Sequence, residues 1–280
     1  MQYKKIAVIG PGLLGGSLLL KCRSLSREVQ LFAWVRPEEW NREIETSLQK
    51  HRITGSTQLA TVVQGADLVV LATPVTAMPE LVKEMRDALA PSTLVTDVGS
   101  VKGWVEEHVA PLLENRTQWI GSHPMAGSHL KGFQAAQANL FDNAMVILTP
   151  TEKTPMNTLE AAHSFWSMLT QKIHVLPPDE HDRLIAQISH VPHLAAVLLM
   201  VNAEPAAWPL RGGGFRDTTR VAAAPAALWR DILLTNQKSI LDSLDHFIEL
   251  ATQTRQWLAE KDADRLNDLL ERASQIRNTL

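Results

Sequence analysis

The first two thirds of the chain alternate short apolar runs with longer segments of helical spacing. Apolar runs of this length, bounded by turn residues, predict strands, of which those over residues 5–9, 66–72 and 94–96 are expected to be buried. The runs cover residues 5–9, 29–35, 66–72, 94–96, 118–120, 144–148 and 172–176. A helical pattern over residues 157–169 joins the last two. Strands that alternate with helices form a parallel sheet covered on both faces, so we predict an α/β fold with a doubly wound sheet of the Rossmann type.

After Pro177 and Pro178 the pattern changes, and no further strand is predicted. Asp179 is placed to cap a long helix, which Pro192 should kink. Residues 194–201 are apolar on every side, so we expect this segment to be buried all round and to contact another subunit. Amphipathic helical patterns follow over residues 225–260 and 263–277.

The length and this change of pattern predict two domains: a dinucleotide-binding domain over residues 1–176 and an all-helical dimerisation domain over residues 177–280. With 45% hydrophobic and 20% charged residues and a net charge of −3, the composition is that of a soluble protein without a basic surface for nucleic acid. The longest apolar run is too short to span a bilayer, so no membrane partner is expected. Cys22 is the only cysteine, which excludes an intrachain disulfide and is compatible with a cytoplasmic location.

A glycine-rich turn follows the first predicted strand and precedes a helical pattern. In this context each glycine of a GxGxxG motif has a structural reason. Gly10 permits the tight turn, Gly12 lets a pyrophosphate approach the backbone, and Gly15 allows close packing of helix and strand. The phosphates would bind the unpaired N–H groups at the start of the helix. The predicted cofactor-binding residues of this turn are Gly10, Gly12, Leu13, Leu14 and Gly15.

The end of the second predicted strand bears on the choice of cofactor. A site for NAD usually places an acidic residue here to accept from the ribose hydroxyls. In this chain Val35 holds that position and Arg36 follows, which favours the 2′-phosphate of NADP while NAD remains possible. Glu38 and Glu39 could reach back, although we expect them in the first turn of the following helix.

Further polar segments come directly after predicted strands. Because ligands of parallel sheets bind outside the carboxyl ends of the strands, these segments should share one crevice with the glycine turn and Arg36. Thr73 and Pro74 are assigned to the cofactor, and Ser100 and His123 to the reacting centre.

His123 is the best placed of the histidines to take a proton during hydride transfer, because an imidazole titrates near neutral pH. We expect it in a tight turn before Pro124, and holding that turn is the alternative role. Ser100 could hydrogen-bond the imidazole, orient a substrate hydroxyl, or cap a helix that begins at Val101. Lys102 is expected to be solvated or to face a phosphate.

Two arginines in the helical domain are candidates for binding an anionic substrate. The guanidinium groups of Arg216 and Arg220 suit a carboxylate, although surface ion pairs with Asp217 or Asp231 are an alternative. No metal site is predicted. The set of His181, His190 and His193 has too little carboxylate or thiolate support, and hydride transfer to nicotinamide needs no metal.

Several of these segments follow one another in register over nearly the whole chain. They are residues 10–15, 71–74, 96–102, 121–127, 189–193 and 214–220. Together they resemble the prephenate/arogenate dehydrogenase family of tyrosine biosynthesis. The His-Pro-Met-Ala-Gly and Phe-Arg-Asp-Thr-Thr-Arg segments are specific to it, whereas the glycine motif is not.

The resemblance implies oxidative decarboxylation of a cyclohexadienol, from arogenate to tyrosine or from prephenate to 4-hydroxyphenylpyruvate, with hydride transfer from C4 to the nicotinamide. It implies that His123 accepts the proton of the 4-hydroxyl and that Ser100 hydrogen-bonds both this histidine and the substrate. Arg220 is implied to bind a substrate carboxylate, with Ser189 and His193 lining the pocket. The helical second domain is implied to form a homodimer.

The chain lacks a mutase-like region before the glycine turn and a strand-rich regulatory domain after the last helix, so we expect a monofunctional enzyme. Its compact length and the arginine after the second strand are shared with cyanobacterial-type arogenate enzymes, which favours arogenate slightly.

Two alternatives remain open at this point. One is another NAD(P)-dependent enzyme with a helical second domain, such as a β-hydroxyacid dehydrogenase or an imine reductase. That hydroxyacid class relies on a lysine in the helical domain, whereas Lys238 and Lys261 lie on polar helix faces. The other is a nucleotide-sensing dimer without turnover, against which the presence of His123, Ser100 and Arg220 argues.

Overall fold

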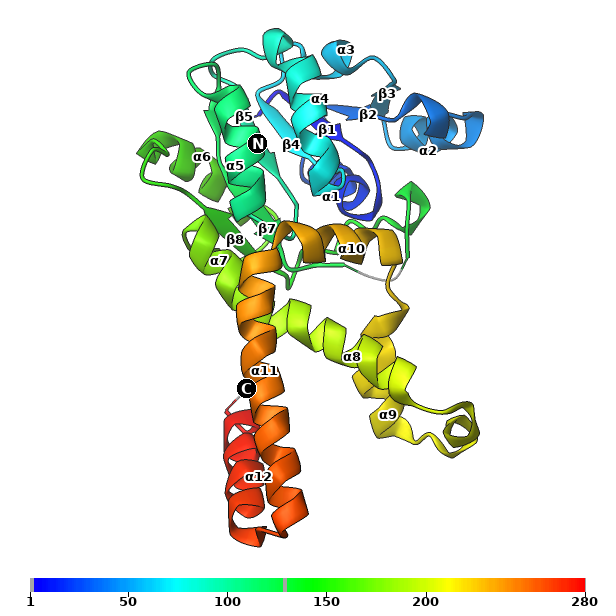
Figure 1. Cartoon of the computed structure of the whole chain (residues 1–280). Helices are drawn as coiled ribbons and strands as arrows, with labels where there is room; N and C mark the ends of the chain where they lie inside the picture. Colours follow the sequence, from blue (N-terminus) through cyan, green and yellow to red (C-terminus); the bar gives the residue numbers. More distant parts are fainter. Residues whose placement is uncertain (1–2, 128–129, 280) are drawn as a thin grey trace.

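The structure of the chain is a computed structural model that describes residues 3–127 and 130–279. Two parts follow one another along the sequence (Figure 1). The first is an α/β part with two sheets, and the second is helical and ends in a long helical hairpin that projects away from the sheets. The predicted division into an α/β and a helical part is therefore confirmed at the level of fold.

The main sheet has six parallel strands in the order β3-β2-β1-β4-β5-β6. This order is the one found in dinucleotide-binding folds, with the crevice for the ligand where the order reverses beside β1. The strands are β1 (Lys5–Ile9), β2 (Gln30–Trp34), β3 (Ile53–Ser56), β4 (Leu68–Leu71), β5 (Leu94–Asp97) and β6 (Gln118–Trp119). The sequence pattern did not predict β3, because this short edge strand has the sequence Ile-Thr-Gly-Ser, with one large apolar residue.

Both faces of this sheet are covered, as expected for a doubly wound fold. In β1, Ile6 and Val8 belong to a core shared with helices α1, α2 and α6, whereas Ala7 and Ile9 belong to a core shared with α3, α4 and α5. The helices are α1 (Leu13–Leu25), α2 (Arg42–Lys50), α3 (Leu59–Val63), α4 (Met78–Met85), α5 (Gly103–Leu113) and α6 (Met156–Ser167). Short 3₁₀ turns are η1 (Pro37–Glu39), η2 (Val75–Ala77), η3 (Arg86–Ala88) and η4 (Phe133–Ala135).

The last two predicted strands do not extend the main sheet. They form a second, three-stranded sheet, in which β8 pairs antiparallel with β7 and parallel with β9. Its strands are β7 (Gly121–Pro124), β8 (Met145–Thr149) and β9 (Lys172–Val175). His123 therefore lies within a strand, and the predicted tight turn is wrong. A short apolar run indicates a strand but not which sheet the strand joins, so the sequence pattern did not predict the second sheet.

The helical part departs from prediction at the N-cap of its first helix and in the division of the helix expected over residues 225–260. Its elements are α7 (Pro178–Ile185), a π-helical turn η5 (Ala186–His190), α8 (Val191–Asn202), η6 (Pro205–Leu210), α9 (Gly213–Thr219), η7 (Arg220–Ala223), α10 (Ala226–Thr235), α11 (Gln237–Glu260) and α12 (Ala263–Arg277). Pro177 rather than Asp179 occupies the N-cap of α7. Pro192 lies in the first turn of α8, and the π-helical turn precedes it. The single helix expected over 225–260 is divided at Asn236.

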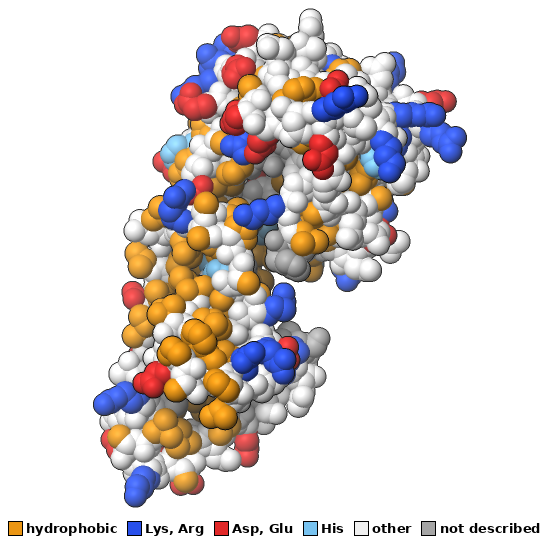
Figure 2. Space-filling model, turned by 90° about the vertical axis from the view of Figure 1, so that its right-hand side faces the viewer, with side chains coloured by type: hydrophobic (Ala, Val, Ile, Leu, Met, Phe, Trp, Pro, Cys, Tyr) orange, Lys and Arg blue, Asp and Glu red, His pale blue; other side chains and the backbone are white. Residues whose placement is uncertain are grey.

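The apolar stretch 194–201 is not buried all round in the single chain. Its second half is exposed, and Val201 has 80% of its surface accessible. Figure 2 shows hydrophobic side chains gathered over the helical part of the molecule. By length and composition alone, the 25 residues Pro178–Asn202 are apolar enough to cross a membrane. However, the buried polar side chains of this stretch, His181, Asp182 and His190, form hydrogen bonds inside the protein.

Candidate active site

The glycine turn between β1 and α1 has the geometry that its sequence predicts. Gly10 adopts a φ of +95°, a conformation that favours glycine. A Cβ on Gly15 would lie 2.3 Å from the carbonyl oxygen of Gly10, whereas a Cβ on Gly12 would meet no atom within 4 Å. Helix α1 begins with no side-chain cap. The turn is therefore closely packed at Gly15 and open at Gly12, and the first N–H groups of the helix are available to a phosphate.

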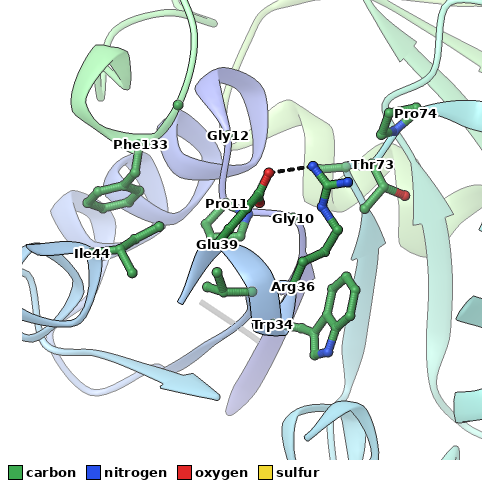
Figure 3. A pocket seen from close by; sticks show the side chains of 13 residues that line it. Gly10, Pro11, Gly12, Trp34, Arg36, Glu39, Ile44, Thr73, Pro74 and Phe133 are labelled. Carbon is green, nitrogen blue, oxygen red and sulfur yellow. Dashed lines mark hydrogen bonds and ion pairs between the residues drawn. The ribbon is translucent and has the colours of Figure 1, made fainter. Parts of the chain in front are cut away.

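A cavity of about 300 Å³ opens beside this turn (Figure 3). The turn after β4 contributes to it, and there the buried Thr73 hydroxyl has no hydrogen-bond partner among the described residues. Its lining consists of Gly10, Pro11, Gly12, Trp34, Val35, Arg36, Glu39, Ile44, Ala72, Thr73, Pro74, Gly132 and Phe133. The structure thus brings together the glycine turn, Arg36, Thr73 and Pro74, as predicted. Leu13, Leu14 and Gly15 form the first turn of α1 and do not line the cavity.

Arg36 shares this cavity with a carboxylate. Glu39 lies in η1 and reaches back to form an ion pair with the guanidinium, as Figure 3 shows, while Glu38 lies 3.9 Å from Nε of Arg36. As expected, both glutamates lie in the first turn of the helix that follows, which is the short 3₁₀ helix η1 beginning at Pro37, and Glu39 also reaches back to Arg36. The cavity therefore presents a cation suited to a 2′-phosphate and an acceptor suited to a ribose hydroxyl.

His123 is buried on β7, and a second histidine contacts it. Its Nδ1 lies 2.8 Å from Nε2 of His181, and Nδ1 of His181 lies 2.8 Å from Oδ1 of Asp182. Burial, and then the neighbouring groups His181, Lys102 and His190, hold the pKa of His123 well below its ordinary value. The imidazole is therefore neutral at pH 7 and able to accept a proton.

Lys102 is buried rather than solvated, and its ammonium faces a carboxylate, so the expectation of a solvated or phosphate-facing side chain is wrong. Its ammonium and the carboxylate of Asp97 are both fully buried and form an ion pair. The ammonium also donates to the carbonyl of Ser122 at 2.8 Å, and Asp97 Oδ1 accepts from the N–H of Ser122 at 3.0 Å. The pair thereby ties the end of β5 to β7 at the residue preceding His123.

Ser100 follows β5 and is half-buried. Helix α5 begins at Gly103 with Lys102 at its N-cap, so Ser100 does not cap it. Within the described part of the chain Ser100 has no hydrogen-bond partner, and Nδ1 of His123 is occupied by His181 instead. Neither Ser100 nor His123 lines the cavity beside the glycine turn. The single predicted crevice thus divides into a nucleotide cavity and the surroundings of His123.

The helical part contributes a layer of aromatic rings. His193 on α8 is buried and stacks on Trp229 of α10 at 3.4 Å with an angle of 1° between the rings. His190 meets the same indole edge-on and hydrogen-bonds Asn236, and Ser189 beside it is half-buried. Nδ1 of His193 is buried and has no partner in the described chain, so it is available to a ligand. Sequence reasoning missed Trp229, because no local motif surrounds it.

Arg216 and Arg220 are both exposed, on α9 and η7. These two elements pack against α8, the helix that carries His193, and Figure 1 shows α9 beside α8. Neither arginine forms an ion pair with a described residue. Asp231 instead pairs with Arg230 at 2.8 Å and accepts from the Thr76 hydroxyl at 3.2 Å. Both guanidinium groups are therefore available to an anion.

Comparison with known proteins identifies the family. A family model described as "Prephenate dehydrogenase, nucleotide-binding domain" matches residues 42–175, and one described as "Prephenate dehydrogenase, dimerization domain" matches residues 177–272. The chain belongs to the prephenate dehydrogenase family. It is 32% identical to a prephenate dehydrogenase of Lactococcus lactis over 99% of this chain and 77% of the relative. It is 33% identical to a cyclohexadienyl dehydrogenase of Zymomonas mobilis over 99% of this chain and 96% of the relative.

Solved structures of prephenate dehydrogenase family members have the same architecture. Aquifex aeolicus prephenate dehydrogenase, in complex with hydroxyphenyl propionate and NAD+, superimposes with a TM-score of 0.90 at 26% identity, covering 100% of this chain and 99% of that one. Synechocystis arogenate dehydrogenase gives a TM-score of 0.84 at 30% identity, covering 98% and 99%. A 3-hydroxyisobutyrate dehydrogenase of Mycobacterium tuberculosis, at 15% identity and a TM-score of 0.59, shares the fold alone.

Proposed function

We propose that this chain is an NADP-preferring dehydrogenase that converts arogenate to tyrosine, prephenate to 4-hydroxyphenylpyruvate, or both, in the cytoplasm. As a member of the prephenate dehydrogenase family it is an NAD(P)-dependent oxidoreductase of tyrosine biosynthesis. The observation that carries the assignment of its chemistry is the buried, neutral His123 on β7, in contact with His181 of the helical part. The competing hydroxyacid dehydrogenase function has only a likeness of fold to support it.

The residues beside β1 fit a dinucleotide. The open space at Gly12, the uncapped start of α1 and the unpartnered Thr73 hydroxyl are places where phosphate and ribose oxygens can bind. When bound, the nicotinamide supplies an acceptor for the hydride that leaves C4 of the substrate. Arg36 is proposed to bind the 2′-phosphate of NADP, for which it must be released from Glu39.

His123 is proposed to accept the proton of the 4-hydroxyl while the C4–H electron pair leaves as hydride. The C1–carboxylate bond then breaks, its electrons enter the ring and CO₂ departs, so the ring becomes aromatic. A correctly placed general base contributes roughly 10²–10⁴-fold in rate. The half-buried Ser100 is proposed to orient the same hydroxyl.

The carboxylates of the substrate require cationic side chains, and the helical part provides two candidates. Arg220 is proposed to bind one of them, with Arg216 nearby in sequence, because neither guanidinium has an ion-pair partner among the described residues. Ser189 and the His193 ring, with its available Nδ1, are proposed to line the same pocket.

The helical part is proposed to form a homodimer. It matches the family's dimerization domain, and in the single chain it exposes large apolar side chains on several helices. A contiguous exposed apolar surface of this kind marks a protein–protein contact.

A four-way assay tests this function. Purified chain is given arogenate or prephenate, each with NADP or NAD, and hydride transfer is followed by cofactor absorbance. We expect turnover with at least one of the two substrates and a higher kcat/KM with NADP. The variant His123→Asn should lose about 10²–10⁴-fold in kcat while still binding NADP. Absence of turnover with both substrates would refute the proposed reaction, and better use of NAD would refute the cofactor preference alone.

A further inference from the structure

The residues that contact His123 form a short chain of hydrogen bonds across the two parts of the molecule. His123 is on β7, and its Nδ1 meets Nε2 of His181 on α7 at 2.8 Å. Nδ1 of His181 in turn meets Oδ1 of Asp182 at 2.8 Å. Both histidine side chains are buried, with His181 fully so. The proton positions along this chain can be deduced from the types of its atoms.

Asp182 fixes the first step, because an ionised carboxylate only accepts hydrogen bonds. Its Oδ1 accepts from the N–H of Lys102 and its Oδ2 from the N–H of Gly103, both at 2.8 Å. Nδ1 of His181 must therefore carry a proton and donate it to Oδ1. The carboxylate also lies at the start of α5, where the helix dipole favours negative charge.

The second step follows from the neutrality of His181. Burial lowers the pKa of this histidine, and the neighbouring Asp182 only partly opposes the effect. In a neutral imidazole one nitrogen donates and the other accepts, so Nε2 of His181 is an acceptor. The group facing it, Nδ1 of His123, must then be the donor. This leaves Nε2 of His123 as the unprotonated atom, which is the form that a general base requires.

Other charged and titratable groups near this pair are already committed to different partners. Lys102 pairs with Asp97 and with the carbonyl of Ser122, and His190 hydrogen-bonds Asn236. The groups that act electrostatically on the two histidines are Asp97, Lys102, Asp182 and His190. In the described chain, His181 is the hydrogen-bond partner of His123 Nδ1.

We propose that His181 and Asp182 are positioning residues that set the tautomer of His123, so that Nε2 faces the reaction as the base. The inference rests on the proposed role of His123. When the substrate O–H bond breaks and an N–H bond forms at Nε2, the resulting imidazolium keeps its Nδ1–H bond to His181, and the Asp182 carboxylate compensates the buried positive charge. A buried carboxylate that orients an imidazole in this way is an established catalytic arrangement in unrelated hydrolases.

The arrangement also makes the base depend on domain contact. His123 and the N–H groups of Lys102 and Gly103 belong to the α/β part, whereas His181 and Asp182 belong to α7. Asn236, at the break between α10 and α11, adds a hydrogen bond of 2.9 Å to the carbonyl of Asp182. His123 is thus held in the required tautomer only when α7 of the helical part is in contact with the α/β part.

The test compares His181→Phe, which removes the acceptor, with His181→Gln, whose amide oxygen can still accept from His123. The ring protonation of His123 is measured by ¹⁵N-resolved NMR of histidine-labelled full-length protein, and kcat by the dehydrogenase assay. We expect Nδ1–H in the wild type and in His181→Gln, which should keep most of its activity. In His181→Phe we expect Nε2–H and a loss of about 10²–10⁴-fold in kcat.

His190→Gln is the matched control, because it replaces another buried histidine of the helical part that forms no hydrogen bond with His123 or His181. It should leave the His123 tautomer unchanged. If His181→Phe keeps Nδ1–H on His123 and stays within a few-fold of wild-type kcat, the positioning role is refuted. If His123→Asn retains turnover, the base assignment itself fails, whatever tautomer NMR shows. The two failures are therefore distinguishable.

Discussion

The two parts of the molecule bury apolar side chains to very different degrees. In the α/β part, two extended clusters cover both faces of the main sheet and include large, fully buried residues such as Trp166 and Phe141. In the helical part, the cluster of buried residues consists of Ala186, Val191 and Ile240. The first part therefore has a core of its own, whereas the second buries few apolar residues within the single chain and would bury more in the proposed homodimer.

The difference also explains how the site is divided. The groups proposed to bind the nucleotide lie entirely within the α/β part, around a cavity formed by its own strands and turns. His123 lies where the two parts of the molecule meet, and its surroundings include His181, Asp182 and Asn236 of the helical part. Cofactor binding should therefore tolerate disturbance of the helical part, and turnover should not.

The largest effect on stability is expected from the buried ion pair in the α/β part. Lys102→Met leaves Asp97 charged, buried and without its cation, which typically costs about 3–5 kcal/mol. The free energy of unfolding from urea titration measures the loss. Lys83→Met is the control, because Lys83 and Glu80 form an exposed pair worth under about 1 kcal/mol. Equal losses for the two variants would contradict the contrast between buried and exposed charge.

Close packing at the glycine turn provides the next prediction. The Cβ of Gly15→Ala would meet the Gly10 carbonyl oxygen at 2.3 Å and Cγ1 of Val8 at 2.8 Å, so the backbone must move. Overpacking of this kind costs about 3 kcal/mol, and binding of NADP should weaken with it. Gly214→Ala on α9 meets no atom within 4 Å and should be neutral or slightly stabilising. Urea titration and cofactor fluorescence compare the two variants.

Acid should destabilise the folded chain, because several histidines where the two parts meet are buried in the neutral form. Burial lowers the pKa of His123, His181 and His193, and that of His190 to about 4. The unfolded chain binds more protons than the folded one between these values and the ordinary 6.5, so stability is lost as pH falls below 6.5. His190 alone contributes about 2 kcal/mol of that loss at pH 5. His190→Gln should flatten the dependence of the free energy of unfolding on pH, and an unchanged slope would contradict it.

Sequence patterns predicted the parts of the fold that depend on neighbouring residues. The roles of Gly10 and Gly15 follow from a strand and a helix that adjoin them in sequence, and the structure gives both the expected geometry. The buried strands of the main sheet were predicted for the same reason, with the short edge strand β3 as the exception. The position of Arg36 at the nucleotide cavity follows from strand β2, which ends two residues before it.

Features that depend on distant residues were not predictable in this way. His181, the partner of His123, is 58 residues away in the sequence. Asp182 accepts a hydrogen bond from the backbone N–H of Lys102, which is 80 residues away. Lysine is rarely buried unless it is paired, so its polar character indicated a solvated side chain. One signal was present: Asp97 ends a fully buried strand five residues before Lys102, and a carboxylate in that position needs a cation.

The smallest effect on the chain itself is expected on the exposed apolar surface of the helical part. Val201→Glu changes a side chain that is 80% exposed in the single chain, so the monomer should lose no more than about 0.5 kcal/mol. In a homodimer that buries this surface, the same carboxylate would be desolvated without a partner, and the dimer should dissociate. Met156→Glu on α6, also an exposed apolar position, is the control in the α/β part. Sedimentation velocity should find Val201→Glu monomeric and Met156→Glu dimeric. A dimer that survives Val201→Glu would place the interface on another surface, and the contrast between a self-contained α/β part and a partner-dependent helical part would then need a different explanation.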